Sequence, residues 1–112
     1  MSAGAQLSVT DLRRAARHPV DYRVIAEHRR LGDVNLHITN VSAQGFMVDG
    51  DLDLDRGERI VMRLPVVGRI EAYLIWAHEK RSGFQFERII RIDDFLKLVD
   101  MLQPNPRLRP RR

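Results

Sequence analysis

Residues 34–48 have the sequence VNLHITNVSAQGFMV, and this stretch decides the fold. Apolar side chains occupy every second position from Val34 to Ile38, which is the pattern of a strand with one buried face. A polar stretch, residues 40–45, separates that strand from the apolar run Phe46-Met47-Val48. Asn and Ser side chains bond nearby backbone groups, and Gly accepts backbone angles that other residues resist. The stretch therefore predicts two strands joined by a tight turn.

Similar patterns recur on both sides of this hairpin. They predict strands over residues 20–26, 34–40, 45–48, 59–64, 69–77 and 83–87, with turns at 29–33, 67–68 and 80–82 and a polar loop over 49–57. Short strands at close spacing, with turn signals between them, are typical of a barrel or a sandwich. In the fifth strand Trp76 continues the alternation of Ile70, Ala72 and Leu74, and this favours a core position for the indole.

A helix is expected after the last strand. Apolar residues recur at helical spacing over 92–102, Asp93 or Asp94 can cap its start, and Pro104 ends it. Residues 1–9 are small and polar, and residues 104–112 are basic and rich in proline, so we expect both termini to be disordered. One domain over residues 10–103 remains.

Composition narrows the class of protein. The net charge of +4 comes from 19 basic and 15 acidic residues, and four arginines without any acid lie after Gln103. The rest of the chain is formally neutral, which argues against a nucleic-acid-binding domain because such domains carry their excess charge on the folded surface. The chain has no cysteine. It has no apolar run of about 20 residues and no signal-peptide pattern. We therefore expect a cytoplasmic protein without a transmembrane segment.

Two motifs point to a function. Thr10-Asp11 can cap a short helical turn, which would bring Arg13 and Arg17 to one face. Downstream, Asn40, Ser42 and Gly45 form an N-x-S-x-x-G pattern, in which the first two side chains share one side of a strand. R-x-x-x-R followed by N-x-S-x-x-G is similar to the two-part signature of the PilZ domain family. The resemblance extends over about residues 13–102, including the Gly68 strand and Gly83-Phe84-Gln85-Phe86.

The resemblance implies a PilZ-like fold, a six-stranded antiparallel β-barrel with a C-terminal α-helix. It also implies that the bacterial second messenger cyclic di-GMP binds between the arginine segment and the strand motif. The expected ligand-binding residues are Arg13, Arg14, Arg17, Asn40, Ser42, Gly45 and Trp76. Guanidinium groups suit this ligand because they bond phosphate oxygens or the guanine edge in pairs and stack on bases. Many family members have Asp where Asn40 stands, which changes the charge of the site.

The expected function is a stand-alone receptor that binds cyclic di-GMP, needs no cofactor and relays the signal to an effector protein. Two alternatives remain open: an adaptor that binds a protein partner without nucleotide, and a small nucleic-acid-binding barrel. The sequence also allows these residues to have no ligand. Residues 40–45 would then be a turn whose polar groups bond within the turn, and the arginines would be solvent-exposed surface charges.

An enzyme is not expected. Ser42 lacks the flanking glycines of a nucleophile elbow, and no phosphate-binding loop is present. Asp49, Asp51, Asp53 and Asp55 alternate, but the positions where a calcium loop needs Gly and Glu hold Arg56 and Met62. The four histidines have no metal-ligand spacing.

Overall fold

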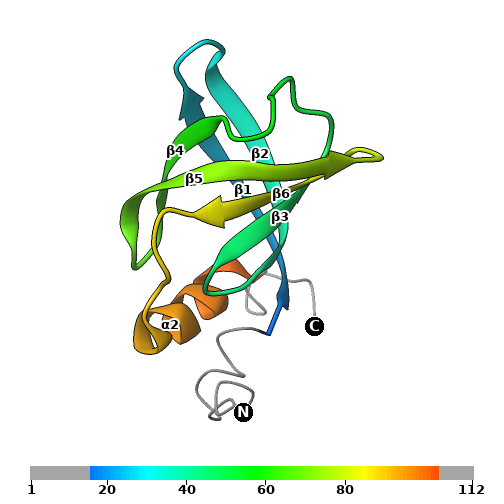
Figure 1. Ribbon diagram of the computed structural model, residues 1–112. Helices are drawn as coiled ribbons and strands as arrows, with labels where there is room; N and C mark the ends of the chain where they lie inside the picture. Colours follow the sequence, from blue (N-terminus) through cyan, green and yellow to red (C-terminus); the bar gives the residue numbers. More distant parts are fainter. Residues whose placement is uncertain (1–15, 104–112) are drawn as a thin grey trace, which may run out of the picture.

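A computed structural model describes residues 16–103, which form a closed barrel of six antiparallel strands with one helix (Figure 1). The elements are β1 (His18–His28), β2 (Gly32–Val41), β3 (Gly45–Asp49), β4 (Arg59–Leu64), β5 (Gly68–His78), β6 (Arg81–Phe86) and α2 (Ile92–Leu102). Around the barrel the strands follow the order β1-β2-β3-β6-β5-β4. The predicted six-stranded antiparallel β-barrel with a C-terminal α-helix is thus confirmed. The expectations for residues 1–9, 10–15 and 104–112 lie outside the described residues.

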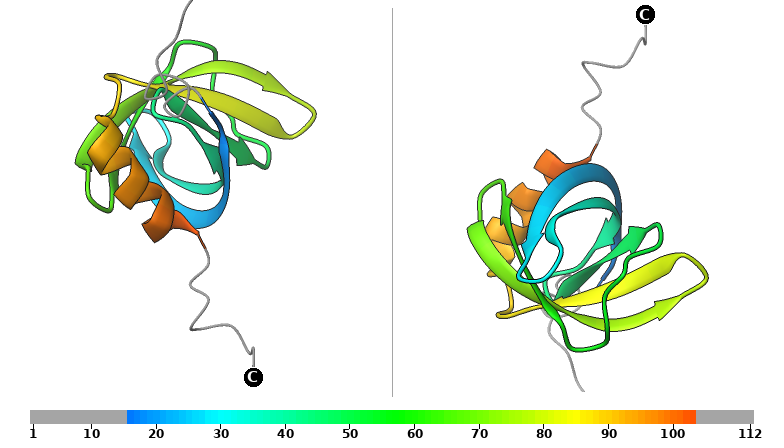
Figure 2. Two further views of the ribbon diagram at one scale, coloured as in Figure 1. Left: turned by 90° about the horizontal axis from the view of Figure 1, so that it is seen from below. Right: turned by 90° about the horizontal axis from the view of Figure 1, so that it is seen from above.

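The hairpin between β5 and β6 differs from the prediction. The two strands turn at Glu79 and Lys80, which both have positive φ, 50° and 64°. Two consecutive residues at positive φ give the two-residue turn whose twist matches that of its flanking strands. The turn predicted at residues 80–82 is therefore misplaced, and β6 begins two residues earlier than expected. The hairpin projects beyond the ring of strands (Figure 2).

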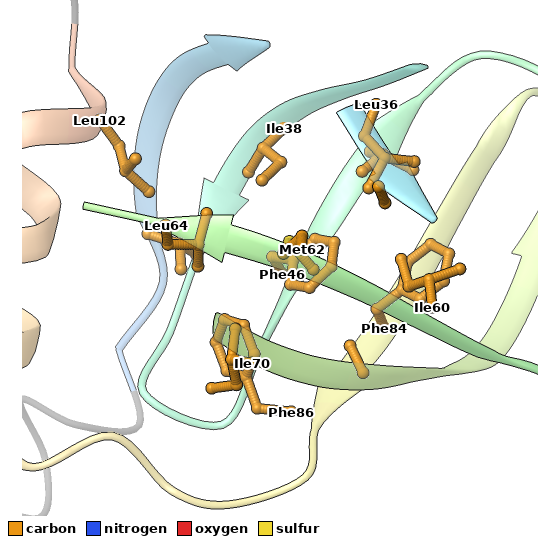
Figure 3. Packing of buried hydrophobic residues seen from close by; sticks show 14 of the residues in the cluster. Leu36, Ile38, Phe46, Ile60, Met62, Leu64, Ile70, Phe84, Phe86 and Leu102 are labelled. Atoms are coloured by element: carbon orange, nitrogen blue, oxygen red, sulfur yellow. The ribbon is translucent and has the colours of Figure 1, made fainter. Parts of the chain in front are cut away.

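Inward-facing apolar side chains fill the barrel (Figure 3). Leu36 and Ile38 of β2 are nearly inaccessible to solvent, as the alternation of that strand predicts. The ring of Phe46 stacks on that of Phe84 with centroids 5.1 Å apart, and it lies 5.2 Å from the ring of Phe86. Full burial of each such side chain contributes about 1.5–3 kcal/mol. These ring contacts join β3 to β6.

Helix α2 lies at the end of the barrel where β1 begins (Figures 1 and 2). Its buried side chains are Phe95, Leu98, Val99 and Leu102. The Phe95 ring meets the His18 ring edge-on at 5.3 Å, which joins the helix to β1. The prediction that Asp93 or Asp94 caps the helix is wrong, because Arg91 is the N-cap residue and makes no side-chain cap bond. Both acids lie in the first turn instead, where they interact favourably with the helix dipole. Within residues 16–103, no helix has the length and apolarity needed to cross a bilayer.

Two β-bulges change which side chains face outward. Along β2 and β3, Ile38 pairs with Val48 and Asn40 pairs with Met47, so Thr39 is an extra residue. The extra residue reverses the alternation, because Ile38 and Val41 both point into the core although they are three residues apart. Strict alternation from Val34 would have turned Asn40 inward. The bulge places its amide on the outer wall.

The second bulge lies in β5. Leu74 pairs with Phe84 and Trp76 pairs with Gly83, which leaves Ile75 as the extra residue. Beyond this point β5 no longer buries alternate side chains, and Trp76 is 38% exposed. The core position predicted for Trp76 is therefore wrong. Ile70, Ala72 and Leu74 are buried as expected.

Candidate functional site

A pocket of about 300 Å³ lies on the outer face of the barrel, where the β2–β3 turn meets β5 and β6. Five residues singled out in the sequence line it: Arg17, Asn40, Ser42, Gly45 and Trp76. They come from three regions of the chain, and the order of the strands brings them together because β3 pairs with β6 and β6 with β5. Arg13 and Arg14 lie outside the described residues. The two motifs therefore meet at Arg17, the last arginine of the first motif.

Ser42 shapes the tight turn between β2 and β3. Its hydroxyl oxygen accepts hydrogen bonds from the backbone N–H groups of Gln44 and Gly45, each at 3.2 Å. The hydroxyl also donates to the carbonyl of Gly45 at 3.4 Å, and the backbone N–H of Ser42 donates to the same carbonyl at 2.8 Å. A hydroxyl has one donor and two acceptor sites, so the turn uses its whole capacity. Ser42 thus fixes the wall of the pocket from within.

Gly45 allows β3 and β6 to approach closely. A Cβ atom at this position would overlap the carbonyl oxygen of Phe84 and lie 3.1 Å from the Cα of Gln85. Both are backbone atoms of β6, so a side chain could not move them without separating the strands. Gly45 does not have positive φ, so glycine is needed here for close packing and not for the unusual backbone angles that the sequence suggested. The neighbour that it admits is the next strand.

The indole of Trp76 lies against the backbone of Gly83. A Cβ atom on Gly83 would overlap the indole Nε1 and lie 2.8 Å from its Cδ1. An aromatic ring that packs on a glycine of the neighbouring strand shields the glycine backbone, which has no side chain of its own to cover it. With 38% of Trp76 exposed, the indole forms one flat apolar side of the pocket.

Asn40 carries the free amide of the motif. Its Nδ2 lies 3.7 Å from the sulfur of Met47, a weak acceptor, and the side chain is half-buried. Within residues 16–103, no oxygen acceptor engages this amide. The side chain lines the pocket, so a ligand bound there would lie beside this amide.

Several lining residues escape sequence reasoning. Gln44 and Gln85 add two exposed amides to that of Asn40, and Gly83 and Met47 form part of the floor. Gly45 pairs with Gln85, and Met47 pairs with Gly83. Gln44 lies within the motif, directly before Gly45. For Gln85 and Gly83 the signal is the register between β3 and β6, because residues across a ladder from the motif share its surface.

The charged groups of the pocket have one sign. Among the residues that the structure describes, Arg17 is the only charged side chain that lines it, and no carboxylate does. Within residues 16–103, no ion pair engages the exposed Arg17 guanidinium. Over the same residues, no group of three potential metal ligands is present. Positive charge, amides and an aromatic face together suit an anionic ligand that carries a planar ring.

A separate polar cluster lies at the opposite end of β2. Buried His28 accepts hydrogen bonds at Nδ1 from the backbone N–H groups of Arg30 and Leu31, and its Nε2 lies 3.4 Å from Glu58. A hydrogen bond from the backbone N–H of Asp55 lowers the pKa of Glu58, and the Arg30 guanidinium at 3.1 Å lowers it further. This cluster ties the β1–β2 turn to the loop before β4 and does not reach the pocket.

Comparison with known proteins does not identify a family for this chain. Neither the family models nor the curated proteins that were searched contain a match to the chain.

Proposed function

We propose that this protein is a stand-alone PilZ-type receptor for the bacterial second messenger cyclic di-GMP. One observation carries the proposal: residues from both parts of the R-x-x-x-R and N-x-S-x-x-G pattern line a single pocket, together with Trp76. These residues are distant in sequence, and the order of the strands brings them to one surface.

The chemistry of the pocket supports an anionic dinucleotide. Arg17 offers a planar fork of donors that pairs with two phosphate oxygens or with the O6 and N7 edge of a guanine. Trp76 offers a flat face on which a base stacks, a contact worth about 1–3 kcal/mol. The volume of about 300 Å³ lies at the lower end of the range for ligand pockets. Arg13 and Arg14 would add to the contacts made by Arg17.

In this proposal the protein transmits the signal by binding cyclic di-GMP and then an effector protein. Cyclic di-GMP bridges the arginine segment and the barrel wall, and the bridged form presents a surface that an effector protein recognises. The protein acts in the cytoplasm, where the second messenger is made, and it catalyses no reaction.

Calorimetric titration of the full chain with cyclic di-GMP tests the proposal. We expect saturable binding that Arg17→Ala or Arg13→Ala weakens by about tenfold to a hundredfold, because each loses charge-assisted hydrogen bonds. Arg63→Ala is the matched control, since Arg63 is an exposed arginine on β4 that does not line the pocket. Deletion of residues 104–112 should leave the affinity unchanged.

Two outcomes would count against the proposal. Absence of binding by the wild-type chain would refute it directly. A tight complex with an oligonucleotide that is lost on deletion of residues 104–112 would favour the nucleic-acid alternative.

The adaptor alternative has one observation in its favour. The Ser42 hydroxyl is fully used within its own turn, so this part of the motif has a structural role without any ligand. An adaptor would bind its protein partner equally well with and without cyclic di-GMP, and Arg17→Ala would not weaken that complex.

A further inference from the structure

Among residues 16–103, the side chains that line the pocket include three amides and no carboxylate. Asn40, Gln44 and Gln85 each supply an amide, and within that range Arg17 is the only charged side chain in the lining. Gln44 and Gln85 are exposed, whereas Asn40 is half-buried and its Nδ2 makes a weak contact with the Met47 sulfur at 3.7 Å. Among these amides, the one at Asn40 is therefore the best placed to read the edge of a base.

A carboxylate and an amide read purines differently. A carboxylate only accepts hydrogen bonds, so it pairs with the adjacent N–H donors of guanine and repels the ring-nitrogen acceptor of adenine. An amide has a donor and an acceptor side by side, and rotation by 180° exchanges them. It pairs with adenine through N6 and N7, and it also pairs with guanine. Arginine, in contrast, matches the O6 and N7 edge of guanine.

We propose that the pocket accepts adenine as well as guanine at Asn40, so that its ligand class is the cyclic purine dinucleotides, including the mixed guanine–adenine one. The inference rests on the function proposed above. In this arrangement Arg17 selects a guanine or a phosphate, and the amide at Asn40 tolerates either purine. A site with a carboxylate at the same position would reject adenine, because the buried acceptor would face another acceptor.

Titration of the full chain with cyclic di-GMP, 3′,3′-cyclic GMP–AMP and cyclic di-AMP tests this inference. The fluorescence of Trp76, the sole tryptophan, gives a second readout at the pocket. We expect the mixed dinucleotide to bind within about tenfold of cyclic di-GMP. Asn40→Asp should widen the preference for cyclic di-GMP by a further tenfold or more. Asn35→Asp is the matched control, because Asn35 is an exposed asparagine on the same strand that does not line the pocket.

The outcomes separate the inference from the proposed function. Binding of cyclic di-GMP with rejection of the mixed dinucleotide by more than tenfold overturns the inference and leaves the receptor function standing. An unchanged preference in Asn40→Asp also overturns it, because Asn40 would then read no base. Asn40→Ala, which removes the amide without adding charge, should weaken both dinucleotides to a similar degree. If none of the three dinucleotides binds, the receptor function fails and the inference fails with it.

Discussion

Replacement of Gly45 by alanine should destabilise the barrel strongly. The new Cβ would overlap the Phe84 carbonyl, which belongs to the backbone of β6 and cannot rotate away. Relief requires β3 and β6 to separate where Gly45 pairs with Gln85 and where the Phe86 N–H donates to the Gln44 carbonyl at 2.8 Å. Overpacking costs about 1–3 kcal/mol, and each weakened hydrogen bond adds about 1 kcal/mol. A loss of about 2–4 kcal/mol follows, or about 10–25 °C in Tm for a domain of this size.

Thermal unfolding followed by circular dichroism measures this loss, and Gly83→Ala serves as the internal comparison. At Gly83 the added Cβ meets the Trp76 side chain, which is partly exposed and can swing toward solvent. We expect that variant to lose only about 1 kcal/mol and to show altered Trp76 fluorescence. The reasoning is refuted if Gly45→Ala melts within about 3 °C of the wild type, or if Gly83→Ala proves the less stable of the two.

Two further predictions concern stability. Phe95→Ala should lower the free energy of unfolding, measured by urea denaturation, by about 3–5 kcal/mol, because the Phe95 ring on α2 is fully buried. Leu96→Ala is the control: its side chain is 40% exposed, so the loss should be less than about 1 kcal/mol. Equal losses in the two variants would contradict this packing. The hydrogen bond from the Asp55 N–H depresses the pKa of Glu58, so the ionised carboxylate stabilises the folded state at any pH above the ordinary pKa of a carboxyl group. Glu58→Gln should therefore lower Tm at neutral pH. That difference should fade as the pH falls through the depressed pKa, and a difference in Tm that stays the same at low pH would contradict this reasoning.

Sequence reasoning predicts the elements of this fold well and their local irregularities poorly. The alternation in Val34, Leu36 and Ile38 reports a buried face directly, because each of these side chains points into the core. The extra residues at Thr39 and Ile75 leave no compositional mark. A bulge is set by how two strands twist against each other, and neither strand alone carries that information.

The same limit applies to the candidate site. The spacing of Asn40, Ser42 and Gly45 is visible in the sequence, but that Ser42 caps its own turn is visible only in the backbone geometry. Strict alternation along β5 predicts a core position for Trp76, but the bulge at Ile75 comes before it and turns the indole outward. Gln85 reaches the pocket through its pairing with Gly45, a contact between residues that are 40 positions apart. Such contacts depend on strand order, which local patterns do not encode.

Neighbouring strands of the barrel differ greatly in how many residue pairs join them. β1 and β2 register over nine residue pairs, whereas β1 and β4 register at one, Glu27 with Val61. The β1–β4 junction is therefore the ladder with the fewest paired residues, although the two strands lie close together. We expect thermal fluctuations to open the barrel there before the other ladders. β3 and β6 lie farthest from that junction in the strand order, so the part of the pocket that they form would keep its shape while the junction opens and recloses. Arg17, which directly precedes β1, belongs to the side of the pocket nearest the junction.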